Sequence, residues 1–137
     1  MTDTIRKVDY FYTMVSNTPG QAAKILSGLA AEGVELLALS GFPNGRKAQV
    51  DLIPADSAKL RRAAKKLGLT LSVRKTGFLV QGDDRVGAMT GIAETLAAAK
   101  INMTAAVAIG AGKGRFGAIF WVKPQSVART ARLLGAK

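Results

Sequence analysis

Asn17–Ile25 reads N-T-P-G-Q-A-A-K-I, and Asp84–Ile92 reads D-R-V-G-A-M-T-G-I. In each stretch, short polar residues and a glycine lead into apolar residues at helical spacing, which is typical of a tight turn that opens an amphipathic helix. Gly20 and Gly87 lie 67 residues apart (87 − 20). A shared pattern at a fixed offset indicates that the chain contains one structural unit twice.

The residues around the first turn predict the element order β-α-β-β-α-β. Runs rich in β-branched and aromatic residues predict the strands, P-N-G at 43–45 predicts a hairpin turn, and Gly68 stops the second helix. Thr18 suits the N-cap of the first helix and Pro19 its first helical position. The predicted elements are strand 8–15, a helix that ends at 32–33, strand 34–42, strand 47–53, helix 55–67 and strand 69–74.

The second half of the sequence repeats this order. Leu67-Gly68 aligns with Leu134-Gly135 at the same offset, and the chain ends at Lys137 without a counterpart of strand 69–74. We therefore predict an α+β fold with two tandem ferredoxin-like βαββαβ units, residues 1–75 and 76–137, of which the second lacks its last strand. The predicted elements of this half are strand 78–81, helix 88–99, strands 101–109 and 115–123, and helix 125–134.

Composition narrows the class of protein. Hydrophobic residues make up 48% of the 137 residues, enough for a packed core. The chain has no Cys and no His, which removes thiolate chemistry, the usual general base and the commonest zinc ligand. The Asp and Glu residues are scattered over different predicted elements and do not form a pair for acid–base catalysis. No apolar run is long enough to span a bilayer. We expect a cytoplasmic protein that is not an enzyme, holds no cofactor or metal, and has no membrane partner.

Lys113–Val122 reads K-G-R-F-G-A-I-F-W-V and tests a nucleic-acid interpretation. RNA-recognition motifs share the predicted element order and display two aromatic residues on the third strand for base stacking. Aligned on the Lys-Gly pair, those two positions hold an arginine and a glycine, and the aromatic residues are one position out of phase. Such a shift turns a side chain to the opposite face of a strand. We therefore expect a core row that faces the helices, with Trp121 buried on the other face; the core row is Phe116, Ala118, Phe120 and Val122.

Gly112–Gly117 spells G-x-G-x-x-G, the pattern of a dinucleotide-binding turn. In such a turn the glycines follow a strand and open a helix, whereas here they lie between two predicted strands. The pattern therefore predicts a hairpin.

Charge keeps an alternative function open. The formal net charge is +11, and five basic residues lie on the predicted helix 55–67. A solvated helix face or a patch that tracks phosphates would each have this composition. A ferredoxin-like module that binds nucleic acid through a basic surface, with Phe78 as a stacking residue, is therefore the alternative. The five residues are Lys59, Arg61, Arg62, Lys65 and Lys66.

The two turns carry the candidate binding residues. Each places short polar side chains at a helix N-terminus, where free N–H groups attract a carboxylate and an Asp or Asn oxygen accepts from an ammonium group. This pairing suits an amphoteric small molecule such as an amino acid, although plain helix capping explains the same residues. The candidates are Asn17, Thr18, Pro19 and Gly20 in the first turn, and Asp83, Asp84, Arg85, Val86 and Gly87 in the second.

At these turns the sequence resembles the ACT domain, whose signature is a D/N-x-P-G-type turn between the first strand and an amphipathic helix. Residues 17–25 fit it, and residues 84–92 fit it with Val86 where Pro is common. The resemblance covers nearly the whole chain as two tandem units. It implies a non-catalytic regulatory protein that binds an amino acid between paired domains. A purely structural module with degenerate sites is the third hypothesis.

The predicted absence of one strand also bears on assembly. A sheet that lacks an edge strand exposes unpaired N–H and C=O groups, which invite pairing with another chain. The resemblance to ACT domains points the same way. We therefore expect a homodimer in which Trp121 loses solvent contact.

Overall fold

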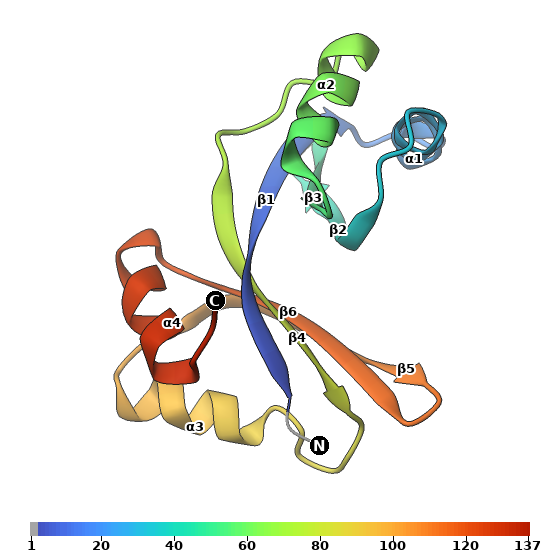
Figure 1. Ribbon diagram of the computed structural model, residues 1–137. Helices are drawn as coiled ribbons and strands as arrows, with labels where there is room; N and C mark the ends of the chain where they lie inside the picture. Colours follow the sequence, from blue (N-terminus) through green and yellow to red (C-terminus); the bar gives the residue numbers. More distant parts are fainter. Residues whose placement is uncertain (1–2) are drawn as a thin grey trace. The chain divides into compact units, whose positions relative to one another are not determined.

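The computed structural model describes residues 3–137, which form two compact units (Figure 1). One unit is Asp9–Lys75, and the other comprises the described residues through Val8 together with Thr76–Lys137. Along the chain the elements are β1 (Thr4–Ser16), α1 (Gln21–Ala31), β2 (Leu36–Asn44), β3 (Lys47–Pro54), α2 (Ser57–Leu67), β4 (Lys75–Asp83), α3 (Thr90–Ala98), β5 (Met103–Gly112), β6 (Arg115–Val122), a short 3₁₀ helix (Pro124–Ser126) and α4 (Val127–Leu134).

The Asp9–Lys75 unit has the strand order β2-β3-β1. Strand β3 is antiparallel to both neighbours, so β1 and β2 run parallel and are joined by α1 in a split β-α-β arrangement. The two-residue turn Gly45-Arg46 closes the β2–β3 hairpin, with Asn44 opposite Lys47. One face of this sheet buries its side chains against α1 and α2, and this core is Phe11, Ile25, Leu29, Val50, Leu52, Leu60 and Ala63.

The other unit repeats the plan with the order β1-β4-β6-β5. Strand β6 is antiparallel to both β4 and β5, so β4, α3 and β5 form a second split β-α-β arrangement. The predicted core row of β6 is confirmed, because Phe116, Ala118, Phe120 and Val122 are all buried in one cluster with Ile92 and Leu96 of α3 and Ala131 of α4. Trp121, on the opposite face, is 6% exposed, so its predicted burial is also confirmed.

The G-x-G-x-x-G stretch forms a hairpin, as predicted. Strands β5 and β6 pair through to Gly112 and Arg115, which leaves Lys113 and Gly114 as a two-residue loop. These two residues have φ of 55° and 72°, and a type I′ hairpin needs φ above zero at both central positions.

No strand follows α4 among the described residues, so the prediction that the second unit lacks its own last strand is confirmed. The vacant sheet edge inferred from it requires correction. Strand β1 begins at Thr4 rather than Val8, and its first residues belong to the same unit as β4. They neighbour β4 in the strand order and run antiparallel to it in Figure 1. Ile5 packs against the core of this unit. The sheet edge beside β4, predicted to be vacant, is therefore occupied by the first residues of β1.

The predicted strand 69–74 also differs from the structure. Residues 69–74 form no strand. They nevertheless lie beside β1, because the Ser72 N–H donates to the Tyr12 carbonyl at 2.8 Å and the Tyr12 N–H donates to the Ser72 hydroxyl at 3.0 Å. A side-chain oxygen replaces a backbone acceptor here, so the ladder of a regular strand does not form.

The boundaries of the two compact units differ from the predicted ones because the start of β1 belongs to the unit of β4. The sequence predicted units of residues 1–75 and 76–137, whereas the compact units group the residues through Val8 with Thr76–Lys137. Strand β1 crosses the division, since its Thr4–Val8 portion belongs to one unit and its remainder to the other. Within residues 3–137, no helix is long and apolar enough to cross a bilayer.

Candidate functional site

The first turn connects β1 to α1 and differs in detail from the predicted cap. Helix α1 begins at Gln21 with Gly20 as its N-cap, rather than with Thr18 as N-cap and Pro19 in the first turn. Gly20 has φ of 91°, a left-handed conformation that favours glycine. The hydroxyls of Ser16 and Thr18 hydrogen-bond to each other at 3.1 Å, so the Thr18 side chain does not cap the helix.

This turn forms one wall of a groove of about 320 Å³. The opposite wall comes from the β2–β3 hairpin, and the Asn17 N–H donates to the Arg46 carbonyl at 3.4 Å to tie the two walls together. Among the described residues that line the groove, none carries a formal charge. They are Val15, Ser16, Asn17, Thr18, Gln21, Ala22, Gly41, Phe42, Pro43, Ala48, Gln49 and Val50.

The side chain of one lining residue, Gln49, is bound to a buried carboxylate. The Gln49 amide donates from Nε2 to Oδ1 of Asp51 at 2.9 Å. Burial raises the pKa of the Asp51 carboxyl, and the hydrogen bond from Gln49 partly offsets that increase. Val50 and Leu52 of β3 face the core with α1 and α2, so the alternate residues Gln49 and Asp51 direct their side chains to the opposite face of the sheet.

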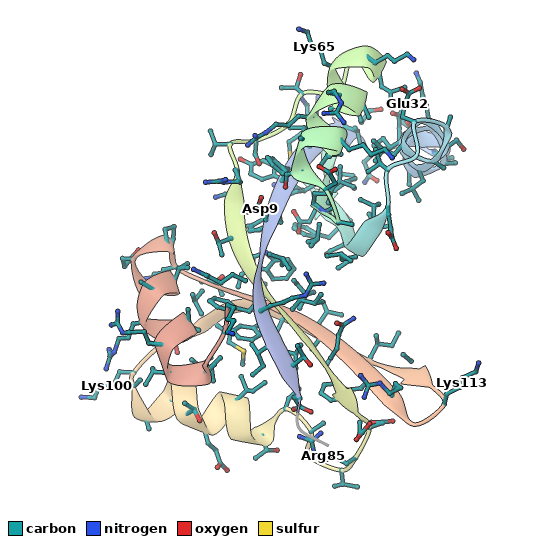
Figure 2. The ribbon with its side chains drawn as sticks, in the orientation of Figure 1. Asp9, Glu32, Lys65, Arg85, Lys100 and Lys113 are labelled. Atoms are coloured by element: carbon teal, nitrogen blue, oxygen red, sulfur yellow. The ribbon has the colours of Figure 1, made fainter. Side chains whose placement is uncertain are left out.

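The second turn, between β4 and α3, has a different character because its arginine is engaged within the chain (Figure 2). The Arg85 guanidinium donates from Nη1 and Nη2 to the two carboxylate oxygens of Asp3, each at 3.0 Å. It also donates to the carbonyls of Asp83 at 2.8 Å and Ala88 at 3.4 Å. The hydrogen bond to Asp3 is the main cause that raises the pKa of Arg85.

The other predicted residues of the second turn are likewise placed by contacts within the chain. Asp83 accepts from Nη1 of Arg115 at 2.8 Å, and the Asp84 N–H donates to the Gly114 carbonyl at 2.8 Å. Val86 is fully exposed, and Gly87 has φ of 73° and accepts from the Thr90 N–H through its carbonyl. Helix α3 therefore starts at Thr90, two residues later than predicted.

Sequence reasoning missed the far wall of the groove and the partner of Arg85. Gln49 and Phe42 face each other in the β2–β3 register, so the P-N-G turn signal could have placed them near the first turn. Asp3 lies 82 residues from Arg85, and no local signal in the sequence connects them.

The aromatic residues do not support nucleic-acid stacking. Phe78 is fully buried, and its ring stacks on Phe120 with centroids 5.1 Å apart. On the basic helix α2, Arg61 lies over the Phe11 ring at 5.2 Å, and Lys66 pairs with Glu32 at 3.3 Å. These contacts are typical of a solvated helix face that also covers core.

Comparison with known proteins identifies the fold. No family model matches the chain, and no curated protein matches it. Among solved structures, protein BT0572 from Bacteroides thetaiotaomicron has a TM-score of 0.82 at 14% identity, over 96% of this chain and 88% of that one. The ligand-free regulatory subunit of aspartate kinase from Thermus thermophilus has a TM-score of 0.66 at 13% identity, over 98% and 95%. The corresponding subunit from Thermus flavus has a TM-score of 0.59 at 14% identity, over the same shares.

The tandem ACT-like fold is confirmed. The similarity covers almost the full length of this chain, including both split β-α-β arrangements, and almost the full length of the regulatory subunits. At these identities the likeness concerns the fold alone.

Proposed function

We propose that this protein is a non-catalytic, cytoplasmic regulatory protein that binds an amino acid in the groove of its first turn. The observation that carries the proposal is the groove itself, which lies between the first turn, with Asn17 and Thr18 in its lining, and the β2–β3 hairpin. Its volume of about 320 Å³ is at the small end of the range of roughly 300–1,000 Å³ for ligand pockets. The similarity to regulatory subunits of aspartate kinase supports a regulatory role.

The chemistry of the groove favours a zwitterion with an uncharged side chain. No side chain caps α1, and the Gln21 N–H donates to the Thr18 carbonyl. The next N–H groups of the first turn, those of Ala22 and Ala23, can receive a carboxylate. Asn17 supplies an amide oxygen for an ammonium group. The remaining lining is largely apolar, with Val15, Phe42 and Val50 available to a hydrophobic side chain. A charged side chain would find no opposite charge among the described lining residues.

A thermal-shift screen of the full chain against the twenty amino acids tests the proposal, because a ligand that binds only the folded state raises its apparent stability. We expect one or a few uncharged amino acids to raise the melting temperature. Gly20→Val should abolish that increase, because a β-branched residue cannot hold φ of 91° without strain.

Gly68→Val is the matched control. Gly68 has φ of 72° and open space where a Cβ would lie, as Gly20 does. It ends α2, whereas Gly20 lies between the groove residues Thr18 and Gln21. This variant should lose stability and keep the ligand-induced increase. If no amino acid shifts the wild-type chain, the structural-module hypothesis replaces the proposal.

We also propose that the chain forms a homodimer, on a basis that differs from the predicted one. The edge beside β4 is filled within the chain, and Trp121 is already buried in one chain. Strand β5 ends the strand order of its unit, its ten residues include no charge, and Val107 and Ile109 are exposed. Two copies of such an edge can pair antiparallel about a two-fold axis, which buries the same surface on both.

A further inference from the structure

The contacts of Arg85 have the geometry of a carboxylate-binding site. Its two terminal nitrogens meet the two oxygens of Asp3 in parallel at 3.0 Å each. This bidentate arrangement is the strong and directional mode of binding between a guanidinium and a carboxylate. The Asp83 and Ala88 carbonyls accept from the same two nitrogens, at 2.8 and 3.4 Å, and fix the plane of the guanidinium.

The surrounding residues are shaped to admit this carboxylate. A Cβ at Gly82 would collide with Oδ1 of Asp3, so only glycine at this position lets the carboxylate reach the β4 backbone. The Phe116 ring lies 5.8 Å from the Arg85 guanidinium and forms another wall. The side chain of Asp3 is 14% exposed, whereas that of Arg85 is 48% exposed. The carboxylate is thus the more enclosed partner, as a bound ligand would be.

We infer that Gly82, Arg85 and Phe116 form a carboxylate cradle that the chain fills with its own Asp3, so that Asp3 acts as a tethered ligand of the second turn. The two turns of the tandem fold therefore differ in state. The first opens onto an uncharged groove, and the second is closed by the side chain that precedes β1. This inference concerns residues of the other unit and holds whether or not the first groove binds an amino acid.

Because Asp3 is part of the same chain, it should outcompete carboxylates in solution for Arg85. A group linked to its site by a short segment competes at an effective concentration in the millimolar range. Asp3 directly precedes β1, whose Thr4–Val8 portion is held in the sheet beside β4. Removal of the Asp3 carboxylate should leave the cradle vacant and able to accept a small monocarboxylate from solution.

The test is chemical rescue of the full-length Asp3→Ala variant by acetate. We expect Asp3→Ala to melt below the wild type, and acetate to raise its melting temperature by on the order of a few degrees over chloride at equal ionic strength. The wild type and the double variant Asp3→Ala/Arg85→Gln should respond equally to acetate and chloride. If Asp3→Ala is unfolded, acetate should restore its far-UV circular dichroism.

Asp83→Ala is the matched control, because it removes a carboxylate from Arg115 in the same unit and leaves the cradle occupied. It should show no acetate-specific increase. An equal response of Asp83→Ala and Asp3→Ala would mean that acetate fills any freed arginine and would overturn the inference. The absence of any acetate-specific effect on Asp3→Ala would also overturn it. Neither result depends on the amino-acid screen of the wild type.

Discussion

Gly33 and Lys100 end their helices in the same left-handed conformation, with φ of 73° and 59°. Each donates its N–H three residues back, to Ala30 and Ala97, and the next residue donates five residues back. This pair of bonds is the Schellman motif. The two positions are 67 residues apart (100 − 33), as are Gly68 and Gly135, which end α2 and α4 in the same way. The duplication thus extends to backbone conformation, with lysine at one position where its counterpart is glycine.

Lys100→Gly should stabilise the chain. A residue with a Cβ in the left-handed region costs roughly 1–2 kcal/mol, which glycine avoids, although glycine loses more entropy on folding. We expect a gain of about 1 kcal/mol in the free energy of unfolding, measured by urea denaturation. Lys100 is exposed, so few contacts are lost (Figure 2). Lys100→Ala, which keeps the strained conformation and removes the side chain, should show no such gain.

Asp51→Asn should change the pH dependence of stability. Burial raises the folded-state pKa of Asp51 above its unfolded value of about 3.9, so the folded chain binds the proton more tightly. The stabilisation from this group is complete below that unfolded value and is lost as pH rises through the folded pKa. The asparagine variant cannot ionise, so its stability relative to the wild type should increase as the pH rises above about 4. Urea denaturation at several pH values measures this difference.

Glu94→Gln serves as the control for this pH series. Glu94 is exposed on α3, and its replacement should leave the pH dependence within about 0.5 kcal/mol of the wild type. A constant difference between Asp51→Asn and the wild type across the same range would contradict the role of burial at Asp51.

Phe78→Ala should act on folding rather than on nucleic-acid binding. Phe78 is fully buried and stacked on Phe120, so truncation should cost about 3–5 kcal/mol of unfolding free energy. Val86→Ala, at a fully exposed position, should change stability by less than about 0.5 kcal/mol. We expect only weak, salt-sensitive binding of RNA or DNA. A tight complex at physiological salt that folded Phe78→Ala specifically weakens would favour the nucleic-acid module instead.

Ile109→Lys should dissociate the proposed dimer. A lysine on β5 places a charge at the edge that two copies would share, and charged edge residues oppose strand pairing. Sedimentation equilibrium at micromolar concentration should give a dimer for the wild type and a monomer for this variant. Val73→Lys, at a position 79% exposed but outside β5, should remain dimeric. A monomeric wild type would rule out the dimer.

The features that depend on local sequence pattern could be predicted from the sequence alone. Alternation along residues 115–122 predicted which side chains of β6 face the helices, and spacing at Gly20 and Gly87 predicted two turns that open helices. Helix ends at Gly68 and Gly135 were predicted because a left-handed residue is a local requirement of the backbone. These features are local, so the residues that determine them are close together in the sequence.

Only the tertiary structure decided which segment completes each sheet and what occupies each turn. Every residue except proline has the same backbone N–H and C=O groups, so the edge of β4 can pair with an extended segment that the fold brings beside it. Here that segment is Thr4–Val8. The same placement brings Asp3 to Arg85, 82 residues away. Among the described residues that line the groove at the first turn, none comes from the segment that precedes β1. The first turn instead faces the β2–β3 hairpin across an uncharged groove. Two similar turns thus acquire different surroundings because the segments beside them are distant in sequence and are brought there by folding.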